Sequence, residues 1–596
     1  MTGRRCSFFT GFSLFSVLFF AYRAPAQQKN AALNKLFAAY YHENQQLYPL
    51  DATLSGDHRY DDRLANDISI AWLNAKERFN KKYLQQLARF NRNLLNTTDK
   101  ISYDVLTEIL TLDLERRKFH FEYLPINQFT SVPLIMAQLG SGNGAQPFKT
   151  KQDYANWINR INDFSDYTDT AIANMRTGMQ TGIVLPKVLV TKMIDQMESV
   201  ANADSLSNEL FNPVRTLPGS FTAVEKKKIA AQMLQAVTQK LLPCYRRLAA
   251  FLKNEYLPRA AAVAGMGALP EGAAMYRFYV RSYTTTNQSP EEIYETGLHE
   301  VARIKEEMEK VKTQTGFTGS LPEFFLFLRS NKQFMPFKTP EEVLNAYRAI
   351  AAKIDKHLDS LFDLKPNTPM VIKRVEAFRE AGQNGPSYLA APADGSSAGI
   401  LYVPVPDATK INVTFLGMEA TYLHEAIPGH HYQIALQQEN KELPAFRNHI
   451  AFSAFFEGWA LYVESLGSQL GCYTDPYQQM GALNNEMHRA LRLVTDVGIH
   501  TGKMTPAQAI AFMLEHESIS EADATLSVER YMAIPGQALS YKTGELEIKK
   551  IRTNCEAILK DKFDLRKFHH ALLVQGDMPL TVLANYMNEW AKEQLH

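Results

Sequence analysis

Residues 417–440 read GMEATYLHEAIPGHHYQIALQQEN and hold three histidines within eight positions, His424, His430 and His431. A helical zinc motif normally places two histidines four residues apart, about one turn, so that both imidazoles face the same way. Here the fourth position after His424 is Pro428, which cannot donate the helical hydrogen bond and clashes with the preceding turn. The stretch therefore predicts a helix with a local bulge or kink, a feature that is frequent at functional sites.

The form of this interruption decides which histidine could join His424. On an undistorted helix, His431 returns to the face of His424, because seven residues make about two turns. If Pro428 and Gly429 form a two-residue bulge, His430 takes that place instead. The spacing alone leaves both histidines open as second ligands.

The dipeptide His-Glu occurs four times in the chain, at His42, His299, His424 and His516. Only after His424 do further histidines follow within eight residues, so we interpret the other three pairs as surface or capping residues. Glu425, adjacent to a candidate ligand without being one itself, is of the type that serves as a general base.

A third candidate ligand lies on the next predicted helix. Residues 451–467, AFSAFFEGWALYVESLG, are strongly apolar but contain Glu457 and Glu464. A buried acid is costly unless it is paired or bound to a cation, so Glu457 predicts either a metal ligand or a buried salt bridge to an arginine. Two histidines, a glutamate and an open position make a catalytic zinc site. Glu464 shares the face of Glu457 and could hold a ligand histidine by a hydrogen bond.

Helical patterns dominate the rest of the chain. Residues 289–314 place apolar side chains at three- and four-residue spacing, with Ser289 as N-cap and Pro290 at the first helical position. Residues 365–410 differ, because they hold two runs rich in β-branched residues, MVIKRVEAF and GILYVPVP, separated by glycines. We therefore expect a mainly α-helical fold with a small β-hairpin or sheet at about 365–410, which could line a cleft and pair with an extended peptide.

The length of 596 residues is too great for one simple core. We expect an N-terminal helical lobe over residues 27–264 and a C-terminal catalytic lobe over residues 265–596. The formal net charge of +1 argues against a nucleic-acid partner, which needs a basic excess. Four cysteines exclude a disulfide scaffold, and the three after residue 26 allow at most one disulfide bond.

Residues 1–26 have the features of a secretory signal peptide. Two arginines precede an apolar, phenylalanine-rich run over residues 7–22, and a small-residue Ala-Pro-Ala pattern ends at Ala26. The run is short for a membrane span of about 20 residues, and Cys6 lies before it rather than at the cleavage point. We expect a periplasmic or secreted protein with no stable membrane anchor after cleavage.

Four motifs in this order resemble the large bacterial family catalogued as domain of unknown function 885. They are HEAIPGHHYQ (424–433), EGWALYVE (457–464), RLVTDVGIH (492–500) and RYMAIPGQALSYKTG (530–544). The family is similar, at a distance, to the helical zinc peptidases that include angiotensin-converting enzyme and the thermostable carboxypeptidases. The resemblance therefore implies a large bilobed helical fold of the zinc-peptidase type.

The resemblance also assigns roles to single residues. The family's motif puts histidine directly after Pro-Gly, so the resemblance favours His430 over His431. It implies one zinc ion on His424, His430 and Glu457, with Glu425 as the base. The downstream motifs supply candidate oxyanion donors and candidate substrate contacts. The candidate oxyanion donors are His500, Tyr531 and Tyr541. The candidate substrate contacts are Gln537 and Arg492.

We expect a zinc-dependent peptidase that hydrolyses short or unfolded peptides by metal-activated water. Two alternatives use the same residues differently. One is a zinc amidase or deacylase acting on a non-peptide amide. The other is a binding protein that kept the fold and lost turnover, although Glu425 and all candidate ligands are present.

Overall fold

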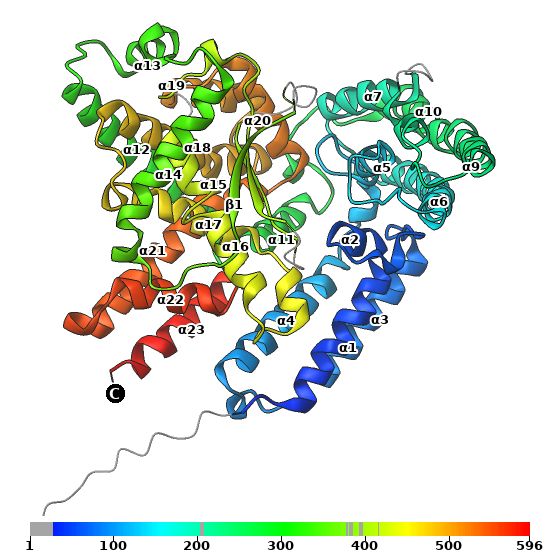
Figure 1. Ribbon diagram of the computed structural model, residues 1–596, viewed down its shortest axis with the longest axis horizontal. Coiled ribbons are helices and arrows are strands. Elements are labelled where there is room, and N and C mark those ends of the chain that lie inside the picture. Colours follow the sequence, from blue (N-terminus) through cyan, green and yellow to red (C-terminus); the bar gives the residue numbers. More distant parts are fainter. Residues whose placement is uncertain are drawn as a thin grey trace, which may run out of the picture.

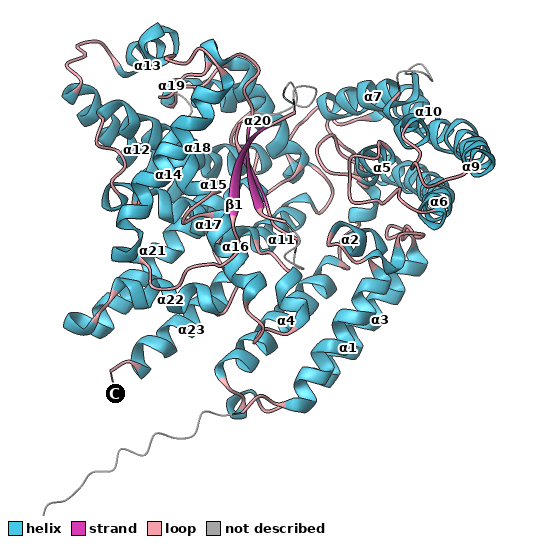
Figure 2. Cartoon of the chain, viewed as in Figure 1, coloured by secondary structure: helices cyan, strands magenta, loops and turns pink. Residues whose placement is uncertain are grey.

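The computed structural model describes residues 28–202, 208–376, 380, 385–392, 397–414 and 417–595. The predicted signal peptide, residues 1–26, lies outside the described residues. Helices dominate, and one small sheet lies among them (Figures 1 and 2), which confirms the predicted mainly α-helical fold. No helix in the described ranges is both long enough and apolar enough to cross a membrane.

The first part of the chain forms α1 (Ala31–Leu47), α2 (Pro49–Leu54), α3 (Ile70–Leu87), α4 (Thr97–Arg116), α5 (Val132–Gly140), α6 (Lys151–Thr181), α7 (Lys187–Asn202), α8 (Asn212–Arg215), α9 (Ala223–Ala236), α10 (Leu242–Phe251), α11 (Gly272–Thr284), α12 (Pro290–Gln314), α13 (Leu321–Ser330) and α14 (Pro340–Leu361). The second part forms α15 (Met418–Glu425), α16 (His430–Glu439), α17 (Ser453–Glu464), α18 (Pro476–His500), α19 (Pro506–His516), α20 (Glu521–Ala533), α21 (Ser540–Leu559), α22 (Leu565–Val574) and α23 (Leu580–Glu593). Ser289 caps α12 as predicted, in a capping box with Glu292.

The N-terminal helices belong to two different hydrophobic cores. One core is built mostly from residues 126–256, which we call the satellite unit; its helices α5 to α10 lie together at the upper right of Figure 1. Helices α1, α3 and α4 instead share a core with the C-terminal half, where Phe37 and Tyr40 contact Phe446 at ring-centroid distances of 5.3 and 5.8 Å. The predicted lobe over residues 27–264 is therefore divided, because amphipathicity shows that a helix buries a face but not against which partner.

The predicted strand region forms a three-stranded mixed sheet. Its strands are β1 (Met370–Arg374), β2 (Ser387–Leu389) and β3 (Gly399–Val403), in the order β1-β3-β2. β1 pairs with β3 in parallel, and β2 pairs with β3 antiparallel, with Tyr388 opposite Leu401. β2 is thus an edge strand of the sheet.

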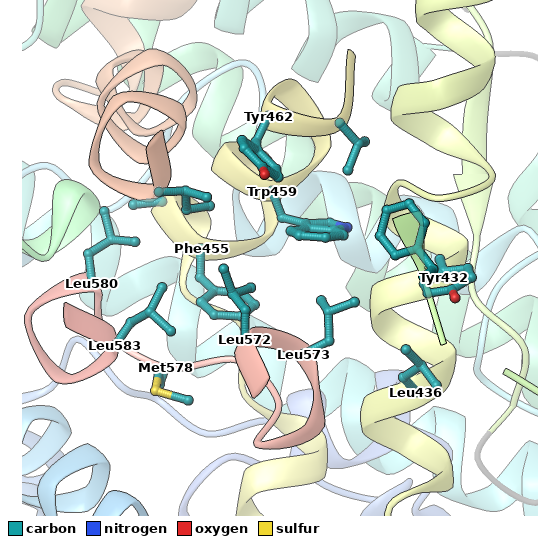
Figure 3. Close-up of a cluster of buried hydrophobic side chains, with 14 of the residues drawn as sticks. Tyr432, Leu436, Phe455, Trp459, Tyr462, Leu572, Leu573, Met578, Leu580 and Leu583 are labelled. Atoms are coloured by element: carbon teal, nitrogen blue, oxygen red, sulfur yellow. The ribbon is translucent and has the colours of Figure 1, made fainter. Parts of the chain in front are cut away.

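The helices that carry the candidate site rest on an apolar core formed by α16, α17, α22 and α23. Figure 3 shows the side chains that fill it, among them Tyr432, Leu436, Phe455, Trp459, Tyr462, Leu572, Leu573, Met578, Leu580 and Leu583. Cys472 and Cys555 belong to this same core, and these two residues and Cys244 are free and buried. Such a packed interior holds its helices at fixed distances from one another.

Candidate metal centre

Two short helices replace the single kinked helix that the sequence predicts. α15 ends one residue after His424, and α16 begins at His430. Gly429 lies at the closest approach between them, because a Cβ there would lie 1.9 Å from the carbonyl oxygen of His424. Trp459 of α17 fixes the break by donating its Nε1–H to the Pro428 carbonyl at 2.8 Å. The Pro-Gly pair therefore ends one helix and starts another in a new direction.

His424, His430 and Glu457 converge on one point. The Nε2 atoms of the two histidines lie 3.3 and 3.4 Å from the same carboxylate oxygen, Oε2 of Glu457. One donor atom from each of the three residues lies within 4.8 Å of the others, and all three residues are buried. The two imidazole rings stand nearly perpendicular, at 82°, with centroids 4.7 Å apart. The structure thus brings together the three residues that the resemblance implies as ligands.

His431 faces a different direction. Its Nδ1 lies 2.9 Å from the hydroxyl of Tyr388 on β2, and it lines a separate cavity beside β1. Burial lowers its pKa to about 4, so this histidine is neutral near pH 7. The alternative that the spacing left open is therefore decided by the break between α15 and α16, which turns His430 toward His424.

The residues present fit a divalent cation. Oε2 of Glu457 is buried, and both histidine Nε2 atoms lie 3.3 and 3.4 Å from it, beyond the usual length of a hydrogen bond. The predicted alternative for Glu457, a salt bridge to an arginine, is not found in the described part of the chain, where its ion pairs are with His424 and His430. Two imidazole nitrogens and one carboxylate oxygen are the donor set of catalytic zinc sites that keep one position open.

The charges of the cluster stabilise each other when no cation is bound. Burial disfavours the protonated form of His424, but Glu457 and Glu464 on its two ring nitrogens outweigh burial and raise its pKa to about 9. Burial likewise disfavours ionised Glu457, but His424 and His430 hold its pKa well below its usual range. A metal ion at this point would have to displace the proton from His424.

Glu464 makes the hydrogen bond that the sequence predicts. Its Oε1 lies 2.7 Å from Nδ1 of His424. Glu464 follows Glu457 on α17 by about two turns, so the two side chains lie on the same face of the helix. Arg489 of α18 approaches the same oxygen at 3.8 Å. A carboxylate on Nδ1 orients the ring and makes Nε2 a stronger ligand, which is the usual support of a metal-binding histidine.

A cleft of about 610 Å³ opens beside this cluster, and Glu425 lines it. Oε2 of Glu425 accepts a hydrogen bond of 2.9 Å from the backbone N–H of Tyr388, so the edge of β2 holds the predicted base. The cleft is walled by α18, by α20 and the segment before it, and by Phe129 and Thr130 of the satellite unit. The cleft therefore lies where the satellite unit meets the C-terminal half.

Four of the predicted downstream residues lie near the cleft. Arg492 and Tyr531 line it, and the Arg492 guanidinium lies over the Tyr541 ring at 4.2 Å. The Tyr531 hydroxyl is buried without a hydrogen-bond partner among the described residues. Gln537 accepts a hydrogen bond of 2.9 Å from Arg530, which also lines the cleft. Arg492 and Tyr531 therefore have polar atoms free for a ligand.

His500 does not reach the cleft. It is 1% exposed, its Nδ1 accepts the backbone N–H of Met266 at 3.0 Å, and its Nε2 donates to the carbonyl of Tyr531 at 2.9 Å. Both ring nitrogens are thus used by the backbone, which corrects the expectation that His500 donates to an oxyanion. Its place at the end of α18 ties that helix to the segment before α11 and to α20.

His488 is the histidine on α18 that lines the cleft, and the sequence reasoning did not select it. It precedes Arg492 by one turn, and its Nδ1 lies 2.9 Å from Oε2 of Glu517. The four-residue spacing from Arg492 is the signal that could have identified it. Glu517 belongs to one of the His-Glu pairs interpreted above as surface or capping residues; it is the C-cap residue of α19 and is 3% exposed, so it is a capping residue and not a surface one.

A close helix crossing explains the glycine in the EGW motif. A Cβ on Gly458 of α17 would lie 2.5 Å from Cα of Gly544, and a Cβ on Gly544 of α21 would lie 2.0 Å from the carbonyl of Ala454. The two helices therefore touch through their backbones. This contact sets the position of Glu457, the residue next to Gly458.

Comparison with known proteins shows the family. The profile described as "Bacterial protein of unknown function (DUF885)" matches residues 49–587, so the chain belongs to this family, as its four motifs predict. The comparison with curated proteins gives no match.

Two solved structures share the fold. A protein from Colwellia psychrerythraea described as a candidate lipoprotein is 26% identical, with a TM-score of 0.86 over 94% of this chain and 99% of that chain. A candidate lipoprotein of unknown function from Shewanella oneidensis is 19% identical, with a TM-score of 0.74 over 94% of this chain and 100% of that chain. The distant similarity to helical zinc peptidases stays a prediction.

Proposed function

We propose that this protein is a zinc-dependent peptidase that acts outside the cytoplasm. One observation carries the proposal. His424, His430 and Glu457 meet in a buried cluster beside a cleft, with both Nε2 atoms 3.3 and 3.4 Å from one carboxylate oxygen. Two imidazole nitrogens and one carboxylate oxygen that converge on one point are the donor set of a catalytic zinc site.

The residues around the cluster can carry out hydrolysis. A divalent ion held by His424, His430 and Glu457 supplies Lewis acidity and makes water easier to deprotonate near neutral pH. Glu425, held by the Tyr388 N–H, takes the proton of the attacking water and passes it to the leaving amine. Tyr531 lines the cleft, and its hydroxyl could donate to the oxygen that becomes negative during the reaction.

The shape of the cleft supports short or unfolded peptides as substrates. Side chains of α18 and α20 line it together with Phe129 and Thr130 of the satellite unit, and its volume is about 610 Å³. A cavity of this size accommodates a flexible chain of a few residues. Edge strand β2 adjoins Glu425 and could pair with an extended peptide.

Location outside the cytoplasm rests on two supports. The sequence of residues 1–26 predicts export. Both structural neighbours are described as candidate lipoproteins, which are exported proteins. Fractionation of cells that express the full chain, with detection in the periplasm, the membrane and the medium, tests this part of the proposal. Finding it in the cytoplasm alone would contradict it.

Metal content is the first test of the site. Purified wild type is expected to hold one zinc ion per chain, and His424→Ala is expected to hold none. His431→Gln is the matched control, because it changes the neighbouring histidine that faces Tyr388 and is expected to keep the metal. Equal metal content in wild type and His424→Ala would refute the proposed centre.

Activity is the second test. The zinc-loaded protein is incubated with a peptide library, with and without chelator, and products are identified by mass spectrometry. Chelator-sensitive cleavage supports a peptidase, whereas turnover of non-peptide amides alone would favour the amidase or deacylase. A metal-loaded protein that turns over neither class would be the binding protein among the alternatives.

A further inference from the structure

A second cavity, which we call the junction cavity, lies where helices α2, α3 and α4 meet the satellite unit. Its volume is about 530 Å³, and residues of α2, α3, α4, α5 and α6, which are neighbours in Figure 1, line it. A cavity of this size can hold a small organic molecule or one end of a longer ligand. Thr130 lines both the junction cavity and the cleft beside the metal cluster, so the two spaces share part of one wall.

Two acids that line the junction cavity lack a close cation from the chain. Burial raises the pKa of Asp51, and burial together with the charge of Asp51 raises the pKa of Asp67 to about 6. Shifts in this direction are those of carboxylates that no nearby cation compensates. Oδ1 of Asp67 is also buried, with no hydrogen-bond partner among the described residues. The two carboxylates therefore have room for a positive group.

Asn80 of α3 adds a third unused acceptor. Its side chain is 1% exposed and lines the same cavity. Nδ2 of Asn80 donates to Asp113 at 3.4 Å, which leaves Oδ1 as the free end of the amide. That oxygen is buried and has no hydrogen-bond partner in the described part of the chain, an arrangement that is costly unless a donor reaches it. The cavity thus presents acceptors that call for N–H donors from outside the chain.

The charges that line the junction cavity favour a cation. Five acids and three bases line it, so their formal charges sum to −2. Each base already has a partner: Lys76 lies 3.1 Å from Asp113, Arg117 lies 3.8 Å from Glu77, and the Arg116 guanidinium lies 4.6 Å from the centre of the Phe121 ring. None of the three bases therefore neutralises Asp51 and Asp67 together.

The surroundings suit an organic cation better than a metal ion. In the described part of the chain, only the cluster of His424, His430 and Glu457 brings three histidine, cysteine or acidic donor atoms within 4.8 Å of one another. The acids of the junction cavity do not converge in that way. Tyr48 and Trp72, with ring centroids 5.2 Å apart, line the cavity as well. Aromatic rings attract organic cations, and a protonated amine or guanidinium also supplies N–H donors for carboxylates.

We propose that the junction cavity binds a cationic amine or guanidinium group through Asp51, Asp67 and Asn80. This site is separate from the metal cluster and needs no turnover there. Two sources offer such a group. One is a free small amine, which needs the junction cavity alone. The other is a peptide that also occupies the adjoining cleft and supplies a basic side chain or its N-terminus.

Calorimetric titration of the full chain, purified and freed of metal with a chelator, tests the site. Cadaverine and agmatine are the charged probes, and 1,5-pentanediol is an uncharged molecule of the length of cadaverine. Wild type is expected to bind cadaverine about 10- to 100-fold more tightly than the diol, the range of one charge-assisted hydrogen bond. Equal binding of cadaverine and diol, or no binding of either charged probe, would overturn the proposal. So would binding of calcium ions in place of the amines.

Asp67→Asn connects the binding to the cavity, because it keeps the shape of the side chain and removes its charge. It is expected to weaken cadaverine binding about 10- to 100-fold. Asp169→Asn is the matched control and is expected to change nothing, because Asp169 is an exposed acid of the satellite unit that pairs with Arg247 at 3.2 Å. Without amine, Asp67→Asn is expected to melt no lower than the wild type, because the ionised acid is costly to bury. A lower melting temperature with unchanged amine binding would assign Asp67 to the fold and refute its role as a ligand.

Three short peptides identify the source of the cation. The first contains lysine and has an acetylated N-terminus, the second has norleucine in place of the lysine, and the third is the norleucine peptide with a free N-terminus. Tighter binding of the first or the third peptide than of cadaverine, lost in Asp67→Asn, assigns the site to a basic side chain or to the N-terminus of a peptide. Binding no tighter than that of cadaverine assigns it to a free amine. All these titrations use metal-free protein, so their outcome and that of the proposed peptidase activity are independent.

Discussion

The satellite unit and the cleft each bury an arginine, and the two arginines have different surroundings. Arg160 of α6 is fully buried, and each nitrogen of its guanidinium donates a hydrogen bond to the protein. Its acceptors are the carbonyls of Tyr60 and Arg63, Gln146 Oε1 and Thr53 Oγ1. Arg492 leaves Nε and Nη1 without a partner among the described residues.

The contrast extends to the groups around each arginine. In the described part of the satellite unit, buried side-chain atoms without a partner belong to neutral groups such as Trp157 and Thr168. At the metal cluster and the cleft beside it, they include atoms of the charged groups Glu457, Glu464 and Arg489. A buried charged group whose hydrogen bonds are all made within the protein holds loops against a helix. A buried charged group that lacks such partners indicates a place for a ligand. The predictions below test this distinction.

Removing the carboxylate that faces both histidines should have the largest effect. Glu457→Ala is expected to lose stoichiometric zinc and to lower chelator-sensitive cleavage to background, because two histidines alone leave the ion without its third protein ligand. Metal analysis and the peptide assay check this. Zinc binding as tight as that of the wild type would show that Glu457 is not a ligand.

Removing the base should have the next largest effect. Glu425→Gln is expected to lower kcat/KM by about 10²- to 10⁴-fold while zinc content stays at the wild-type level. The glutamine keeps an acceptor for the Tyr388 N–H, so the loss would report proton transfer rather than disorder of β2. Activity close to that of the wild type would remove Glu425 from the mechanism.

Glu464 should act on the metal through His424. Glu464→Gln is expected to weaken zinc binding about 10- to 100-fold. In the wild type, zinc affinity should rise with pH up to about 9, because the proton on His424 must leave first. The variant lacks one carboxylate that raises this pKa, so its rise should end at a lower pH. Competition titrations with a fluorescent chelator at several pH values measure both effects.

The metal-free cluster should make stability depend on pH. The pKa of His424 is raised from 6.5 to about 9, so its contribution is complete below pH 6.5 and is lost as pH rises toward 9. The pKa of Glu457 is lowered from 4.5, so its contribution is present above that value and is lost in acid. Chelated protein is thus expected to resist urea best between these limits, and bound zinc should remove the loss toward pH 9. A metal-free protein equally stable at pH 6 and pH 9 would contradict this account.

Arg160 should have the smallest effect on the site. Arg160→Met is expected to lower the free energy of unfolding by about 2–4 kcal/mol, because it leaves several buried acceptors without donors. Zinc content and kcat/KM of the folded variant should match the wild type. A selective loss of activity would mean that buried charge in the satellite unit also serves the cleft.

Several site residues could be predicted from local patterns. Glu457 and Glu464 stand out because charged residues are rare in an apolar helix, and their seven-residue spacing puts them on one face. The N-cap at Ser289 and the strand region could be predicted equally well, because both depend on residues that are neighbours in the chain. Patterns of this kind work because helix and strand geometry relates side chains a few residues apart.

Other features depended on contacts between distant segments. His488 and His500 lie on the same helix, and their spacing does not tell that one faces Glu517 and the other the backbone of Met266. The division of residues 27–264 between two cores was hidden for the same reason.

The amino-acid sequence alone predicted a mainly helical protein with a candidate metal site near residues 424–464, because helical periodicity and charged residues in an apolar helix are local properties. The choice of His430 over His431 from geometry, the cleft beside the satellite unit and the unpartnered arginines emerged when the helices packed. The direction of a side chain after a break such as that before His430, and whether a buried charge finds a partner, are set by residues on other helices, such as Trp459, and no local pattern contains them.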